Sequence, residues 1–129
     1  MSLDVFVQGF RRGESARGDG HEVRKALERF ISDSGGTWAR VTTGDGDAEV
    51  YGMDDLDSGL MFTNLSGRAV WDVVFETARA GGFVVMPVGC PVGVPDERHL
   101  EHLPTSLVDR AGVVVVSSGT DLLAVVQSA

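Results

Sequence analysis

The stretch Gly81–Pro95 reads GGFVVMPVGCPVGVP and joins the pattern of a buried strand to a proline-rich segment. Its first half contains Phe83–Val88, an unbroken apolar run of the length that is typical of a buried strand. Its second half holds Pro87, Pro91 and Pro95 at regular spacing. Proline lacks the N–H that a helix interior or a central strand requires, so this spacing excludes a helix. We therefore expect a sheet strand that runs into an ordered, apolar loop.

Two amphipathic helices are predicted upstream of this stretch. The first is expected to begin after an N-cap at Asp19 and to end at Gly35–Gly36, and the second to begin near Ser66 and to end at Gly81–Gly82. In both segments the apolar residues recur at the spacing of one helical face: Val23, Ala26, Leu27, Phe30 and Ile31 in the first, and Val70, Trp71, Val74, Phe75 and Ala78 in the second. We also expect helical turns over Asp96–His102 and a short helix over Leu122–Val126.

Short β-type runs account for most of the remaining apolar residues. The predicted strands are Leu3–Phe10, Thr37–Thr43, Ala48–Met53, Leu60–Leu65, Phe83–Val88 and Val113–Val116, with a Gly-Asp-Gly-Asp turn at 44–47. Three consecutive strands joined by tight turns favour an α+β fold. We predict a single two-layer domain over residues 1–129, with a mostly antiparallel sheet of about five to six strands and two main helices packed on it. The helix before Phe83–Val88 leaves room for one parallel crossover, which would make the sheet mixed.

Composition limits the class of protein. The chain has 129 residues, of which 43% are hydrophobic and 23% charged, as is ordinary for a globular domain. No stretch approaches the length of a membrane span, and the N-terminus lacks the basic region of a signal peptide and carries Asp4 among its apolar residues. Cys90 is the only cysteine, so no internal disulfide can form. These features predict a cytoplasmic location without membrane attachment.

The distribution of charge points to the kind of partner. The net charge of −8 argues against nucleic acid, because phosphate binding requires a basic surface. Between Val41 and Gly67 the chain has no Lys or Arg but six acidic residues, namely Asp45, Asp47, Glu49, Asp54, Asp55 and Asp57. We predict that they form an acidic hairpin face that engages a basic protein partner, with Tyr51, Met53 or Leu56 as an apolar anchor. The alternative is an acidic surface that faces water and has no partner.

A second hypothesis is a small enzyme or ligand-binding domain with its pocket at the Gly/Pro loop 87–95. Its residues would be Cys90, His99 and His102, in which two histidines three positions apart follow the loop. The spacing matches no strong zinc pattern, and no cysteine-enzyme signature surrounds Cys90. Asp45, Asp47 and Glu49 alternate like calcium ligands, but Val50 and Leu56 occupy the positions where a calcium loop needs glycine and glutamate. We predict no metal, no cofactor and no catalytic residues. A third hypothesis is a structural homodimer that pairs through Val88–Val94.

The first strand and its loop, from Asp4 to Glu14 (DVFVQGFRRGE), resemble a group of small uncharacterised bacterial proteins. Members of this group open with a similar strand that ends in Gln-x-Phe and a Gly-Glu turn. The resemblance implies a protein similar to the immunity-like components of bacterial toxin systems. It brings no catalytic motif and assigns no role to any residue.

Overall fold

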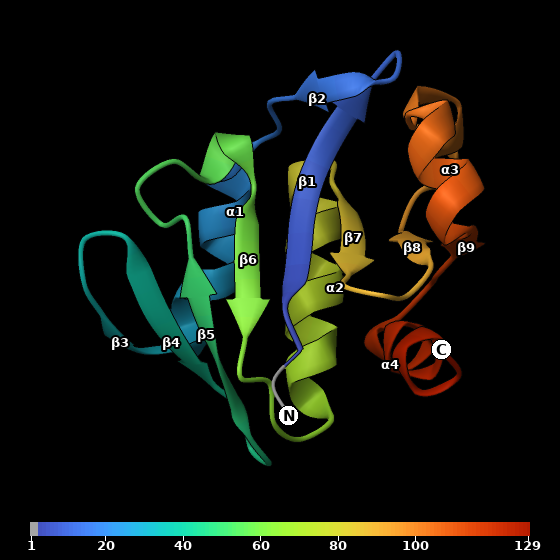
Figure 1. Ribbon diagram of the computed structural model, residues 1–129. Helices are drawn as coiled ribbons and strands as arrows, with labels where there is room; N and C mark the ends of the chain where they lie inside the picture. The colour runs from blue at the N-terminus through green and yellow to red at the C-terminus, as the bar shows by residue number, and fades with distance from the viewer. Residues whose placement is uncertain (1–2) are drawn as a thin grey trace.

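The computed structural model describes residues 3–129 as strands and helices arranged around one continuous sheet (Figure 1). The described strands are β1 Val5–Arg11, β2 Glu14–Ala16, β3 Ile31–Ser34, β4 Trp38–Thr42, β5 Asp47–Tyr51, β6 Leu60–Thr63, β7 Val84–Pro87, β8 Val92–Val94 and β9 Val113–Val115. The α-helices are α1 Gly20–Leu27, α2 Ala69–Gly81, α3 Thr105–Ala111 and α4 Gly119–Gln127. Three 3₁₀ helices, η1 Glu28–Phe30, η2 Leu56–Ser58 and η3 Glu97–His102, complete the described elements.

The strands are ordered β3-β4-β5-β6-β1-β7-β8-β9, and β2 pairs with β1 outside this path. β1 lies between β6 and β7 and is antiparallel to both. The only parallel pair among the described strands is β8–β9. The sheet is therefore mixed and the fold is α+β, as expected. The predicted number of strands is wrong, because the sheet has nine strands and not five to six. β6 and β7 run in the same direction on either side of β1, so the helix between them does not produce a parallel pair.

The three strands that the sequence pattern missed are short and depend on a neighbour. β2 follows a tight turn in which Arg12 and Gly13 both have positive φ, the backbone that a two-residue hairpin requires. β3 begins at Ile31, which the helical spacing had placed in the first helix. β8 lies between Pro91 and Pro95, where the missing N–H groups fall outside the strand. Segments of three or four residues carry too little periodicity to be recognised without their partner strands.

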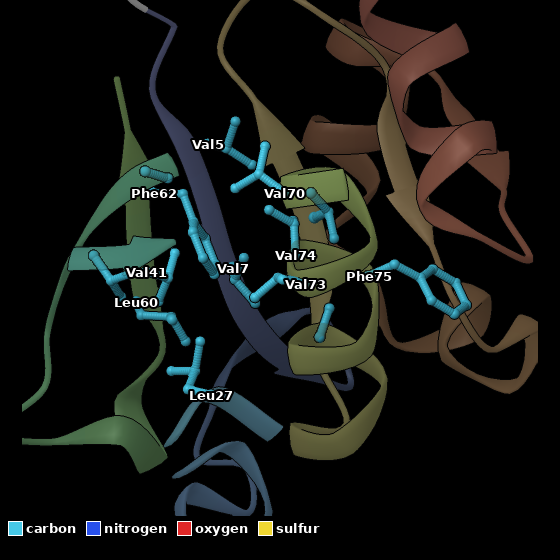
Figure 2. Packing of buried hydrophobic residues seen from close by; sticks show 14 of the residues in the cluster. Val5, Val7, Leu27, Val41, Leu60, Phe62, Val70, Val73, Val74 and Phe75 are labelled. Atoms are coloured by element: carbon cyan, nitrogen blue, oxygen red, sulfur yellow. The ribbon is translucent and has the colours of Figure 1, made fainter. Parts of the chain in front are cut away.

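The main core lies between one face of the sheet and the helices α1, α2 and α4 (Figure 1). Figure 2 shows Val5 and Val7 of β1 beside Val70 and Val74 of α2, and all four side chains are buried. The neighbouring strands add Val41, Leu60 and Phe62 to the same cluster. α2 ends at Gly81, and the following Gly82 adopts a left-handed conformation (φ 73°) that ends the helix. The predicted stop at Gly81–Gly82 is correct, as is the Asp19 cap of α1, whose carboxylate accepts from Glu22 N.

The opposite face of the sheet is covered only at one end. There α3 packs against β7 and β8, where Leu107, Val108 and Ala111 contact a second cluster around Val84 and Val92. This helix was not predicted, because the helical turns before Pro104 were expected to end the segment. Over β4, β5, β6 and the first half of β1 no α-helix of residues 3–129 lies on this face, whereas Phe10 near the end of β1 packs against the second cluster (Figure 1). The fold thus leaves a large part of one sheet face open, which is called the open face below.

The two outer edges of the sheet differ in their protection. β3 is interrupted by a register shift between Ile31 and Asp33 and carries charge, both of which hinder pairing with another chain. β9 presents Val114 and Val115, which are 38% and 48% exposed. None of the helices in residues 3–129 is both long and apolar enough to span a bilayer.

Candidate functional site

A row of large apolar side chains crosses the open face from strand to strand. The register places Trp38 of β4 opposite Tyr51 of β5, and Tyr51 opposite Met61 of β6. β1 then contributes Phe6, which is opposite both Met61 and Met86 of β7. Directly opposite side chains on one face of a sheet lie close enough to contact one another. The five residues, named the apolar row below, therefore form one band across five strands.

The apolar row is accessible to solvent at its middle. Phe6 is 43% exposed and Tyr51 is 40% exposed, while Val5 and Val7 beside Phe6 and Val50 before Tyr51 point into the core. An aromatic side chain on the outer face of a strand gains little from folding, since it stays in contact with water. Exposed aromatic residues within one apolar band are instead typical of interaction surfaces.

Charged groups lie on the same face beside the apolar row. Arg40 Nη1 lies 3.2 Å from Asp47 Oδ2, and Arg40 Nη2 lies 3.6 Å from Glu49 Oε1. The Tyr51 hydroxyl donates to Glu49 Oε2 at 3.0 Å, and this bond raises the pKa of Tyr51 above its usual value. Asp4 at the start of β1 accepts a hydrogen bond from Thr63 at 2.8 Å. Three carboxylates and one guanidinium give this part of the open face a net negative charge.

A second acidic group occupies the loop between β5 and β6. Arg17 donates to Asp55 at 2.9 Å and to Asp57 at 3.2 Å, while Gly20 N donates to Asp57 at 2.7 Å. The Ser58 hydroxyl first and Arg17 second lower the pKa of Asp55. Asp55 and Asp57 therefore fix the loop against the start of α1. Asp54 is exposed and has no hydrogen bond or ion pair among the described residues, so its carboxylate remains free for a partner.

Asp45 lies at the other end of β5 and has a structural role. Its carboxylate accepts from Arg68 N at 2.8 Å and from Ala69 N at 3.2 Å, so it caps the N-terminus of α2 from a neighbouring turn. These two backbone donors, Arg68 first, lower the pKa of Asp45. Ser66, the expected cap, instead bonds to Asp47.

The predicted acidic residues therefore form separate groups at three places along β5 and its loops. Asp47, Glu49 and Tyr51 lie together on the open face, Asp54, Asp55 and Asp57 follow in the loop after β5, and Asp45 lies before the strand. Of the predicted anchors, Met53 and Leu56 are buried in the core and only Tyr51 is exposed. Arg17 and Arg40, which lie outside the base-free stretch, supply the cations that the stretch itself lacks.

The structure does not bring Cys90 together with His99 and His102. Cys90 lies in the turn between β7 and β8, whereas both histidines lie in η3, which follows the far end of β8. An antiparallel hairpin separates its turn from its open end, so the two groups are at opposite ends of β7 and β8. His102 Nδ1 accepts from Arg12 N at 3.2 Å and so supports the β1–β2 turn. No group of three or more His, Cys, Asp or Glu residues among residues 3–129 is placed to hold a metal ion.

The loop Val88–Val94 is also less available for pairing than its sequence indicates. Val92 and Val94 form part of β8 and are buried between β7 and β9. Val88, at the tip of the turn, is 57% exposed. A homodimer through this loop would therefore contact Val88 alone among these three valines.

A pocket of about 460 Å³ nevertheless lies at this loop. It is bounded by Pro87–Cys90 on one side, by Phe6 and Met86 on the sheet, and by α3 on the other side. Since Phe6 and Met86 also belong to the apolar row, the pocket and the open face are continuous.

The sequence contained a signal for part of this site. In the alternation of β1, Phe6 falls on the same side as Asp4 and Gln8, where an aromatic residue is unexpected. Trp38, which the strand pattern of Thr37–Thr43 does not distinguish from its neighbours, lies at the outer end of the apolar row. Comparison of the chain with protein-family models, with curated proteins and with solved structures finds no match.

Proposed function

We propose that this protein is a small binding protein that engages a basic protein partner through the open face of its sheet. The observation that carries the proposal is the apolar row, because Phe6 and Tyr51 in this row are the only exposed aromatic residues among residues 3–129. Aromatic residues of this kind contribute most of the affinity in many protein interfaces.

The charge of the surface supports a basic partner. Asp4, Asp47 and Glu49 lie on the same face as the apolar row, where Arg40 is the one cation paired with any of them among residues 3–129, and Asp54 lies in the loop that follows Tyr51. The chain as a whole carries a net charge of −8, which repels nucleic acid and attracts a positively charged protein. Charges at the rim of an interface mainly accelerate association, and the apolar residues then supply the affinity.

The segment that resembles immunity-like bacterial proteins, Asp4 to Glu14, contains β1 and therefore Phe6. An immunity-like role, in which the open face blocks a basic toxin, is the form of this function that we propose to test first. Neither role requires catalytic residues.

The decisive experiment compares exposed apolar residues on and off the apolar row. Immobilised wild-type protein would capture partners from the native host at low salt, and the affinity of a purified, basic, stoichiometric partner would then be measured by calorimetry. Phe6→Ser and Tyr51→Ser should each weaken binding at least tenfold, because each removes an aromatic anchor. Leu100→Ser is the matched control, since Leu100 is 41% exposed but lies in η3, outside the apolar row.

The charge contribution is best tested at Asp54. Asp54→Asn should slow association and leave dissociation nearly unchanged, and this difference should fade at high salt. Substituting Asp55 or Asp57 would disturb the loop itself, because both carboxylates accept hydrogen bonds from Arg17 and Asp57 also accepts one from Gly20 N. Equal affinity of wild type, Phe6→Ser and Tyr51→Ser for the captured partner would exclude the open face as its binding surface.

A further inference from the structure

The pocket beside the β7–β8 turn has a composition that selects one class of small ligand. Its apolar wall is formed by Phe6, Met86, Val88, Val92, Leu107 and Ala111. α3 packs on the cluster that contains Phe10, Val84 and Val92, and a hollow lies between the flank of this helix and the exposed ring of Phe6. Its volume of about 460 Å³ is within the range of small-molecule sites, which are mostly apolar with a few polar groups.

Within the described part of the chain, Arg110 in the last turn of α3 is the one charged residue that lines this pocket. Unlike Arg17, Arg40, Arg79 and Arg98, it forms no ion pair among residues 3–129, and no hydrogen bond joins it to another described residue. The carboxylate of Asp4, which precedes β1, accepts a hydrogen bond from Thr63 of β6 and forms no ion pair with Arg110. The guanidinium is therefore available to a bound molecule.

We infer that the pocket binds a small amphipathic monocarboxylate, with its apolar body against Phe6 and Leu107 and its carboxylate paired with Arg110. A guanidinium pairs with a carboxylate through two parallel hydrogen bonds, and the exposed Arg110 can form this pair with a ligand whose apolar body lies against the pocket wall. A cationic ligand would be repelled by Arg110, and a dicarboxylate would have to bring its second charge against an apolar wall without a partner. The site goes beyond the proposed binding of a protein and does not depend on it.

The turn Pro87–Cys90 beside the pocket carries a thiol whose reactivity should depend on whether the pocket is occupied. Gly89 has φ 81°, and Cys90 N donates to Pro87 O, so the turn holds a fixed shape beside the pocket. Cys90 lines the pocket and is the only cysteine of the chain, so a thiol reagent modifies one known position. A molecule bound in the pocket should shield this thiol.

The test is a calorimetric titration of the full chain with octanoate, accompanied by octanol, octylammonium and acetate. Octanoate should bind at one saturable site, octylammonium more weakly, and acetate not detectably, because it lacks the apolar body. Arg110→Gln should lower the affinity for octanoate about tenfold and leave the affinity for octanol unchanged. Octanoate should also slow the alkylation of Cys90 by N-ethylmaleimide, to the extent expected from its measured occupancy.

Two further measurements keep the result interpretable. Ala111→Phe should fill the pocket and abolish binding of octanoate and octanol, provided that its circular dichroism spectrum matches that of the wild type. If this variant does not fold, blocking the pocket of the wild-type protein with a bulky maleimide on Cys90 provides the same test.

The inference is overturned by any of three results: no saturable binding of octanoate, equal affinity in wild type and Arg110→Gln, or binding that does not protect Cys90. Tyr51 does not line the pocket, so Tyr51→Ser should leave octanoate binding intact. Loss of octanoate binding in Arg110→Gln with retention of the protein partner would show that the two sites act separately. Failure of one proposal therefore leaves the other open to its own test.

Discussion

Replacing Thr77 with valine should make this protein more stable. Thr77 lies in α2 on the same buried face as Val70 and Val74, and it is completely buried. Its hydroxyl oxygen is shielded from water and has no hydrogen-bond partner among the described residues. A buried polar group without a partner costs about 1–3 kcal/mol, and Thr77→Val removes this cost while keeping the branched shape of the side chain.

The size of the effect follows from this single group. Removal of the desolvation cost should raise the free energy of unfolding by about 1–3 kcal/mol. For 129 residues the entropy of unfolding is about 0.27 kcal/mol/K, so the melting temperature should rise by about 4–11 °C. Urea denaturation and differential scanning calorimetry measure the two quantities independently.

The control is Thr77→Ser, which keeps the hydroxyl and removes the methyl group. It should lower the free energy of unfolding by about 1 kcal/mol, so the two substitutions should have opposite signs. If Thr77→Val is equal to or less stable than the wild type, the hydroxyl has a partner in solution, and the reasoning from an unsatisfied group is refuted.

Three further predictions concern the turn before β5 and the edge of the sheet. Gly46→Ala should lower the free energy of unfolding by about 2–3 kcal/mol in urea denaturation, because a Cβ there would collide with the carbonyl oxygen of Ser66. The control Gly44→Ala, which has open space around it, should change the free energy of unfolding by about 0.5 kcal/mol or less. Equal effects of the two substitutions would contradict the packing at Gly46. Asp45→Asn should be less stable than the wild type at neutral pH. Because the pKa of Asp45 is lowered from its ordinary 3.8, its stabilisation is complete above that value and is lost as the pH falls through the lowered pKa; a difference in melting temperature that stayed constant down to strongly acidic pH would exclude this role. Val115→Lys at the edge strand should leave stability within about 0.5 kcal/mol and raise solubility in a precipitation assay, and unchanged solubility would show that this edge does not self-associate.

The turn at 44–47 illustrates how a correct prediction can rest on the wrong cause. The Asp-Gly pair predicted a hairpin because glycine tolerates positive φ, and β4 and β5 do form that hairpin. Neither Gly44 nor Gly46 has positive φ. Glycine is required at 46 because the backbone before α2 passes too close for a side chain, and that contact joins segments far apart in the sequence.

The acidic residues show the same limit for the candidate site. Their sequence spacing indicated one face, but β5 separates Asp45 from Asp54, and Arg17 and Arg40 approach from other elements. A charge count along the chain includes neither the distance between two ends of a strand nor the cations that folding brings alongside. Met53 and Leu56 were predicted as apolar anchors, but both are buried in the core and cannot contact a partner.

The sequence by itself determined the α+β class, the capped start of α1, the end of α2 at two glycines, and the buried strand before the prolines. Each of these depends on residues within one or two turns of the chain, where propensity and periodicity act directly. Only the tertiary structure decided that β1 lies between β6 and β7, that β2, β3 and β8 exist, and that Phe6 and Tyr51 share one open face. It also placed Arg110 beside the pocket and separated Cys90 from the histidines. These features depend on which strands pair, and pairing is fixed by the packing of the whole core and not by any local pattern.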